Sequence, residues 1–300
     1  MKIEITFLGT SDAIPTSSRN HSAVLLNHET ETILFDCGEG TQRQFRILKL
    51  NPCKLTKIIL THLHGDHSLG LPGLLKTLDM MSYAKTLRIY GPRGLKEHFF
   101  HLQKLYGRFG IKHELHEIHS TSIPIINEKN FQIIASPMSH NIETFAYAFI
   151  IKEKTRIRKD KLKKLKLPNS PLLKQLQQGK NIIFKGRKIK AKDLTYKQES
   201  KKVSIVLDTA MNNNIIPLVK DSDILICEST YSSEDEQRAR DYKHLTTKQA
   251  ADIAKKANVK ELILTHISHR YQHIAKKLEA EARKTFKNAK LAKDFDKIIL

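Results

Sequence analysis

Tryptophan is absent from this 300-residue chain, and aromatic residues of all kinds make up only 7% of it. Cysteine is almost as scarce, with three residues, an odd total and no Cys-X-X-Cys pair. This usage argues against a disulfide framework and is typical of a reducing compartment. No apolar run approaches the roughly 20 residues that a membrane-spanning helix needs, and the N-terminal segment lacks the apolar stretch of a signal peptide. We therefore expect a cytoplasmic protein that does not associate with membranes.

Acidic residues are also few, with 31 Asp and Glu against 52 Lys and Arg, a net charge of +21. Such an excess suggests an anionic partner, most often a nucleic acid. A source organism with generally lysine-rich proteins would explain it equally well, so composition leaves both explanations open. The 40% of apolar residues suffices for a sizeable core in one large domain or two small ones.

The basic residues concentrate in one segment. Residues 152–197 hold 17 Lys and Arg against three acidic residues, a net charge of +14. The pattern predicts a short basic helix that ends before Pro168, and a second helix with Ser170 as its N-cap and Gly179 near its end. We expect an inserted arm at about 152–180 with few core residues. A phosphate-binding arm is favoured over a solvated loop, because so many like charges repel one another unless an anion neutralises them.

The rest of the chain alternates apolar strand patterns with helical ones. A helix is expected at 246–258, beginning after a threonine, and another at 271–292. The strands are expected at 2–10, 22–27, 32–38, 57–62, 86–92, 131–140, 144–151, 203–209, 223–230 and 261–266.

Two strand endings recur in the two halves of the chain. KIILTH at 57–62 is echoed by ELILTH at 261–266, and TILFDCG at 32–38 by SIVLDTA at 204–210. Coincidence is possible with short apolar strings, but the repeated final residues, His and Asp, are metal-ligand types. A duplicated α/β half would place both sets of strand ends at one cleft.

The sequence THLHGDH at 61–67 places three histidines and an aspartate directly after a buried strand. In extended chain His62 and His64 point the same way, and Asp66 and His67 follow where the chain turns. Neutral imidazole and carboxylate suit zinc and similar ions, so a metal site is favoured over a solvated polar loop. Four ligands cannot complete two metal shells. The further candidates also end apolar strands, and they are His140, Asp208 and His266.

Further motifs extend the pattern over nearly the whole chain. They are FLGTSDAIPTSSRN, FDCGEGTQRQ, THLHGDHSLGLPGLL, SH, LDT, CESTY, HLT and THISHRY, in this order. With them the chain resembles the ribonuclease Z (tRNase Z, short-form) family of the metallo-β-lactamase superfamily. The resemblance implies an α/β fold, an αββα four-layer sandwich, formed by residues 1–300 as a single domain with the inserted arm. Ser17 and the Ser170-Pro171 pair depart from the family pattern.

The resemblance also assigns metal ligands. Two Zn²⁺ ions per subunit are expected, with Mn²⁺ as a possible substitute, and Asp208 would bridge them. The first ion would be held by His62, His64 and His140, and the second by Asp66, His67 and His266. Asp36 would lie outside the ligand shell and orient a ligand histidine.

The implied activity is removal of the 3′ trailer from precursor tRNA, by attack of a metal-activated water on one phosphodiester. The products would be a tRNA with a 3′-OH and a trailer with a 5′-phosphate. Asp66 would accept the proton of the water, and His244, oriented by Glu228, would protonate the leaving O3′. A homodimer is a further family expectation. The RNA-binding candidates are Arg270, Arg156, Arg158, Lys159, Lys163 and Lys164.

Other interpretations remain. A small-ester or thioester hydrolase of glyoxalase II or lactonase type would use the same metals but needs no basic arm. A non-catalytic RNA-binding protein would not need the full ligand set. A second histidine cluster would share one face if it were helical, but it lacks acidic partners, so a solvated face is expected there. Its members are His98, His101, His113, His116 and His119.

Overall fold

The computed structural model describes residues 2–119 and 124–300. The chain divides into two compact units. The first unit comprises residues up to 126, 133–149 and 202–300, and the second comprises 127–132 and 150–201. Among the described residues, no helix has the length and apolar character needed to cross a membrane.

The first of two large sheets is formed mostly by the N-terminal half of the chain, in the order β18-β1-β2-β3-β4-β5-β6. The strands β1, β2 and β3 pair antiparallel, whereas β3 to β6 run parallel. The strand bounds are β1 Ile3–Gly9, β2 Ala23–His28, β3 Glu31–Phe35, β4 Lys57–Ile59, β5 Leu87–Gly91, β6 His113–Glu117 and β18 Lys297–Ile299.

The second sheet has the order β17-β16-β15-β14-β9-β8-β7. Its strands β14 to β17 run parallel. The bounds are β7 Ile126–Asn127, β8 Phe131–Met138, β9 Thr144–Ile151, β14 Lys201–Val206, β15 Ile224–Glu228, β16 Glu261–Thr265 and β17 Ala289–Leu291.

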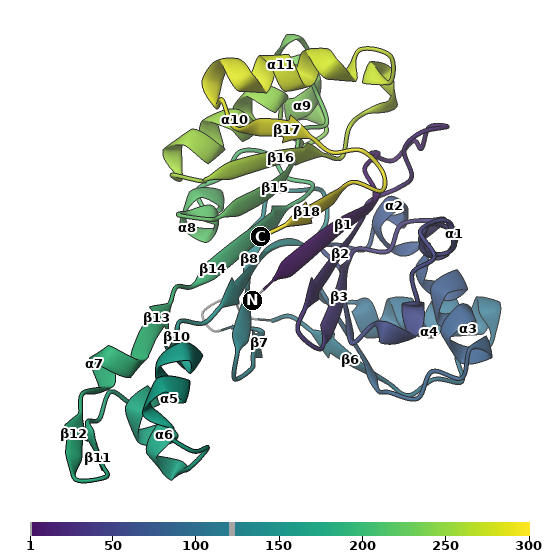
Figure 1. Ribbon diagram of the computed structural model, residues 1–300. Helices are drawn as coiled ribbons and strands as arrows, with labels where there is room; N and C mark the ends of the chain where they lie inside the picture. The colour runs from purple at the N-terminus through teal and green to yellow at the C-terminus, as the bar shows by residue number, and fades with distance from the viewer. Residues whose placement is uncertain (1, 120–123) are drawn as a thin grey trace. The chain divides into compact units, whose positions relative to one another are not determined.

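The two sheets pack face to face. The Tyr147 hydroxyl on β9 donates to the Leu60 carbonyl after β4 at 2.7 Å. The ring of Tyr147 also lies 6.0 Å from that of Phe35 on β3, and both side chains are fully buried. Helices cover the outer faces, with α1, α3 and α4 against the first sheet and α8 to α11 against the second (Figure 1). This arrangement is the predicted αββα sandwich.

Short helices flank the sheets. Thr246 is the N-cap of α10, in agreement with the predicted threonine start. Its hydroxyl accepts from the Gln249 amide, and the Gln249 side chain accepts from the Thr246 amide. The helix bounds are α1 Thr41–Ile47, α2 Gly65–Ser68, α3 Leu71–Met80, α4 Leu95–Tyr106, α8 Ile215–Val219, α9 Glu236–Asp241, α10 Thr247–Lys256 and α11 Ala275–Thr285. Among the described residues, 3₁₀ turns span Pro52–Lys54, Ser233–Asp235 and His269–Tyr271.

The second unit contains the basic arm. Its helices α5 and α6 confirm the two helices predicted there, with Ser170 at the N-cap of α6. The unit has few buried residues, as expected, but five of them form a small apolar core of its own: Leu167, Leu176, Ile182, Ala191 and Leu194. The bounds are β10 Lys154–Ile157, α5 Lys159–Leu165, α6 Pro171–Gln177, β11 Ile182–Phe184, β12 Arg187–Ile189, α7 Ala191–Leu194 and β13 Thr195–Gln198.

One local prediction is wrong. The helix expected at 271–292 covers only Ala275–Thr285, because the residues after it form β17 at the edge of the second sheet, where Ala289 and Leu291 are buried. The helix on which the second histidine cluster would have shared one face is not formed either, because His113 and His116 lie on β6, which pairs with β5. Strand pairing at a sheet edge is a tertiary interaction, and it overrides a local helical pattern.

Candidate active site and metal centre

The predicted site residues gather where strands of both sheets end. His62 follows β4, Asp208 follows β14 and His266 follows β16. Their strands run parallel to neighbours in the same sheet, and the carboxyl ends of such strands meet along one edge. His140 follows β8, and Glu228 is the last residue of β15. The topology thus brings together residues that are up to 204 positions apart.

Three residues that follow strands near the site, including Asp36 after β3, have left-handed backbone conformations. The φ angles of Asp36, Asp208 and His266 are 57°, 40° and 57°. This region costs about 1–2 kcal/mol for most residues, and Asp and His occupy it more readily than bulky or β-branched ones. The turn that follows each strand directs the side chain toward the site. Asp36 and Asp208 share this conformation, in agreement with the sequence echo between the halves.

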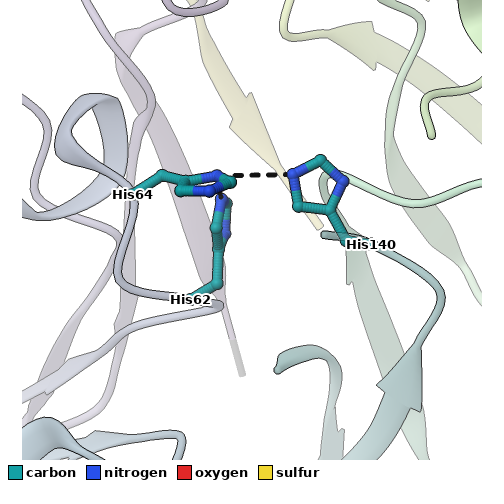
Figure 2. A group of neighbouring side chains, drawn as sticks. All are labelled: His62, His64 and His140. Atoms are coloured by element: carbon teal, nitrogen blue, oxygen red, sulfur yellow. Dashed lines mark hydrogen bonds between the residues drawn. The ribbon is translucent and has the colours of Figure 1, made fainter. Parts of the chain in front are cut away.

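A first group of imidazoles converges on one point. The Nδ1 atom of His64 lies 3.0 Å from Nε2 of His62 and 3.3 Å from Nε2 of His140. Figure 2 shows the three rings, with dashed lines marking these contacts. Nitrogens bound to one tetrahedral zinc at 2.0–2.1 Å lie about 3.3 Å apart. The spacing of the three nitrogens therefore matches a shared metal ion.

A second group lies beside the first. Nε2 of His67 is 3.3 Å from Nε2 of His266 and 3.3 Å from Oδ2 of Asp66. The same Asp66 oxygen lies 3.6 Å from Nε2 of His266. These three side chains also have the spacing of ligands around one ion.

Asp208 lies between the two groups, with one oxygen toward each. Its Oδ1 is 3.3 Å from His67 Nε2 and 3.1 Å from His266 Nε2. Its Oδ2 is 3.7 Å from His62 Nε2 and 3.9 Å from His140 Nε2. Oδ1 is buried and has no hydrogen-bond partner in proper geometry among the described residues. A buried carboxylate oxygen in this position fits a bridging ligand of two cations.

The electrostatics of the site favour positive charge. Burial alone would raise the pKa of Asp66 and Asp208, but the neighbouring histidines lower it below the ordinary range. Burial would likewise lower the pKa of His67 and His266, but the carboxylates, Asp208 foremost, raise it. In the first group, burial lowers the pKa of His62 and His140, so their ring nitrogens stay neutral and free to bind a metal. The seven side chains therefore fit a pair of divalent cations.

Two polar contacts orient ligand candidates from behind. His67 donates through Nδ1 to Asp36 Oδ2 at 2.6 Å, and both side chains are fully buried. His140 donates through Nδ1 to the Lys243 carbonyl at 3.1 Å. Each contact leaves Nε2 free to face the centre, as is usual for metal-binding histidines. Asp36 thus contacts a candidate ligand, in the place where an orienting residue was predicted.

The half-buried His244 and the fully buried Glu228 form a pair next to these groups. Nδ1 of His244 lies 3.1 Å from both carboxylate oxygens of Glu228. Burial alone would lower the pKa of His244, but the charge and hydrogen bond of Glu228 outweigh it and raise this pKa to about 9. The histidine is therefore protonated at neutral pH and able to donate a proton.

A cavity of about 340 Å³ opens over the site. Arg270 lines it, together with Asp66, Asp208 and His244. Sequence reasoning did not single out several other lining residues: Asp12, Ile14, Asn141, Thr230, Tyr231, Tyr242 and His269. The only signal for Tyr231 was its place at the end of the CESTY motif. The only signal for Tyr242 was its position two residues before His244.

The other RNA-binding candidates lie in the second unit and do not line this cavity. Lys159, Lys163 and Lys164 lie on α5 and are exposed. Arg156 donates to the Gln198 side chain at 2.9 Å, and the guanidinium of Arg158 lies 5.6 Å from the Tyr196 ring.

The second histidine cluster is not gathered into a metal-binding group. Within the part of the chain that the structure describes, every group of at least three close ligand atoms belongs to the site above. His113 packs 4.8 Å from the ring of Phe99, and His116 stacks on Tyr90 at 4.6 Å.

Comparison with known proteins decides among families that share this fold. Ribonuclease Z of Pediococcus pentosaceus is 38% identical over 304 residues and covers 98% of both chains. Ribonuclease Z of Bacillus mycoides is 39% identical over 300 residues and covers 97% of both chains. The chain belongs to the ribonuclease Z family. The crystal structure of the short form of human tRNase Z is also similar, with a TM-score of 0.71, 28% identity and 98% coverage of both chains.

A family model described as anti-Pycsar protein Apyc1 matches residues 3–196. This match includes five of the seven candidate ligands but ends before Asp208, Glu228, His244 and His266. The ribonuclease Z relatives extend over these positions as well, so the interpretation as a small-ester or thioester hydrolase is not favoured.

Proposed function

We propose that this protein is a metal-dependent endoribonuclease that removes the 3′ trailer of precursor tRNA. The observation that carries the proposal is the pairing of two ligand groups across Asp208, with the His244–Glu228 pair beside them. Membership of the ribonuclease Z family supports the choice of a phosphodiester in RNA as the substrate.

The metal-binding residues follow from the donor geometry. His62, His64 and His140 would hold one ion, Asp66, His67 and His266 the other, and Asp208 both. When bound, two such ions would acidify water and stabilise the charge on the transition-state oxygens. A donor set rich in imidazole suits Zn²⁺, and Mn²⁺ is a possible substitute.

The side chains of the protein would then move two protons. The Asp66 carboxylate, ionised because of its histidine neighbours, accepts a proton from the attacking water. His244 is protonated at neutral pH and donates its proton to the leaving O3′. Glu228 holds His244 in place and keeps it charged through the contact at 3.1 Å. The products are a tRNA with a 3′-OH and a trailer with a 5′-phosphate.

Substrate binding is assigned to two regions. Arg270 in the cavity lining would contact a phosphate near the scissile bond. The arm, with its net charge of +14 over residues 152–197, would contact phosphates elsewhere on the tRNA. In this proposal the chain forms one catalytic domain with the basic arm inserted into it. The proposal also includes a cytoplasmic location, because the three free cysteines suit a reducing compartment.

A homodimer is the proposed assembly. Large apolar side chains are exposed at the ends of α3 and α4, namely Met80, Leu105 and Tyr106, and Phe100 is exposed midway along α4. The end of α3 lies beside the segment after α4, because Asp79 accepts from the Gly110 amide at 3.0 Å. Exposed apolar patches of this kind mark protein interfaces. Sedimentation of the purified protein should therefore give twice the chain mass, and Leu105→Lys should reduce it.

Cleavage of a labelled precursor tRNA tests the proposal directly. The zinc-loaded protein should produce one new 3′-OH end at the mature tRNA boundary. Asp66→Ala should abolish the product, whereas the control variant Glu234→Ala changes an exposed carboxylate outside the cavity and should cleave normally. Unchanged cleavage by Asp66→Ala would contradict the two-metal assignment.

A further inference from the structure

The two halves of the site share an arrangement of three side chains that the sequence echo does not include. In the first half, the Thr61 hydroxyl donates to Asp36 Oδ2 at 2.8 Å and lies 3.0 Å from Nδ1 of His62. All three side chains are fully buried. The contacts therefore form a chain from carboxylate to threonine to histidine, shielded from water.

The second half repeats this chain with different residues. The Thr230 hydroxyl donates to Glu228 Oε2 at 2.6 Å and lies 2.9 Å from Nδ1 of His266. These residues are at most 2% exposed. In each half the same carboxylate also contacts a second histidine directly: Asp36 contacts His67 at 2.6 Å, and Glu228 contacts His244 at 3.1 Å.

The chemistry of the threonine fixes the direction of every hydrogen bond. A carboxylate can only accept, so the single hydroxyl proton must point toward it. The lone pairs of the hydroxyl are then left for the histidine, whose Nδ1 must carry the hydrogen and donate. The lone pair of a neutral imidazole is consequently confined to Nε2, the atom that faces the candidate metal position in both His62 and His266.

We propose that Thr61 and Thr230 are matched positioning residues, one for each metal ion of the centre. Thr61 fixes the ring orientation and tautomer of His62 for the ion shared with His64 and His140. Thr230 does the same for His266 and the ion shared with Asp66 and His67. The proposal rests on the metal centre of the proposed function, and it adds that each threonine controls one ion and not the other.

Replacement by valine keeps the shape of threonine and removes its hydroxyl, and replacement by serine keeps the hydroxyl. Metal-free protein would be titrated with Zn²⁺ against a chromophoric chelator, which resolves a tighter and a weaker site. Thr61→Val and Thr230→Val should each weaken one site by about 10–100-fold, a typical effect of losing such a partner. The weakened site should differ between the variants, and Thr61→Ser and Thr230→Ser should bind both ions as the wild type does.

Thr6 supplies a matched control. It is buried, and its hydroxyl has no hydrogen-bond partner among the described residues. Thr6→Val should therefore leave both zinc affinities unchanged. If a valine variant at 61 or 230 does not fold, as judged by circular dichroism, alanine at the same position takes its place in the titration.

Imidazole ¹⁵N NMR of the metal-free protein gives a second readout that does not depend on cleavage. His62, whose pKa burial lowers, should show a protonated Nδ1 and a bare Nε2 in the wild type, and a mixture of tautomers in Thr61→Val. If both valine variants bound both zinc ions with wild-type affinity, and the tautomer of His62 did not change in Thr61→Val, this inference would be wrong and the proposed function would stand. Failure of the wild type to bind zinc or to cleave precursor tRNA would instead overturn the proposed function.

Discussion

At the scale of single residues, the contact between His244 and Glu228 decides which proton the site can deliver. A histidine with its ordinary pKa would be mostly neutral at pH 7, whereas Glu228 raises the pKa of His244 to about 9. The same carboxylate accepts from the Thr209 amide at 2.6 Å and from Thr230, so its position is fixed by three partners. In the proposed mechanism this arrangement makes His244 a proton donor, although its ring lies close enough to His140 and Asp208 to be tested as a ligand.

Substitution of His244 tests whether it is a proton donor or a ligand. His244→Ala should slow single-turnover cleavage by about 10²–10⁴-fold, the usual contribution of a general acid. Its zinc content should stay at two ions per chain, measured by elemental analysis. Loss of an ion in this variant would reassign His244 as a ligand.

The pH profile should report the same proton. A general acid works only when protonated, so cleavage should decline as pH rises through about 9. Glu228→Gln removes the charge that raises the pKa of His244, and the alkaline decline should move toward the ordinary value of 6.5. An alkaline limb that stays in place in both Glu228→Gln and His244→Ala would assign the titration to another group.

The sequence was sufficient to place the candidate ligands, because each of them follows an apolar strand and has a metal-binding side chain. It did not point to Thr61 or Thr230. Threonine is common at strand ends, and its role here depends on a carboxylate 25 residues away for Thr61 and on a ring 36 residues away for Thr230. Such contacts exist only once the strands are side by side.

At the scale of elements, the loop after β3 and the turn that contains Asp66 approach each other very closely. The Cys37 amide donates to the His67 carbonyl at 2.8 Å, and the Gly70 amide donates to the Cys37 carbonyl at 2.8 Å. A Cβ on Gly38 would lie 2.3 Å from the Asp66 carbonyl oxygen. Glycine at 38 therefore allows the two loops to pack, and this packing holds the Asp66 turn in place.

Gly38→Ala should consequently force these loops apart. We expect a loss of about 1–3 kcal/mol in the free energy of unfolding, measured by urea denaturation, and weaker zinc binding. Gly91→Ala is the control, because its Cβ would meet Leu60 at an ordinary 3.5 Å. Equal stability of Gly38→Ala and the wild type would show that the close approach is not needed.

Elements with a strong local pattern could be predicted, and those defined by pairing could not. The apolar spacing and the threonine cap of α10 are local features, and the helix was found where expected. In contrast, β17 and β18 are three-residue strands at sheet edges, and nothing in their own sequences distinguishes them from loop or helix. Their neighbours β16 and β1 determine them.

At the scale of the whole molecule, the candidate metal ligands and the excess of basic residues lie in different parts of the chain. The ligand groups belong to the first unit, and most of the excess positive charge belongs to the second. The charge imbalance was visible in the sequence, but the small core around Leu176 was not, because its apolar residues are scattered among lysines. Such a core allows the arm to hold its cations on a folded surface.

Neutralising part of this surface should weaken RNA binding selectively. The triple variant Lys159→Gln, Lys163→Gln and Lys164→Gln should bind tRNA less tightly, with a salt dependence flatter by roughly 0.7–0.9 per lost phosphate contact. Hydrolysis of a small phosphodiester should be unaffected. Filter binding over a range of salt concentrations, together with a chromogenic diester assay, measures both effects.

The control removes three exposed lysines outside the arm, Lys255, Lys256 and Lys284. This variant loses the same net charge and should keep most of the affinity for tRNA. Equal weakening in both triple variants would mean that net charge alone drives binding and that the arm has no special role.

The proposed mechanism requires seven side chains from both halves of the chain to hold two divalent ions next to one another. Anomalous diffraction from crystals of zinc-loaded protein tests it most directly. Two peaks per chain are expected, one among His62, His64 and His140 and one among Asp66, His67 and His266, with Asp208 between them. A single peak, or peaks only at other residues, would contradict it.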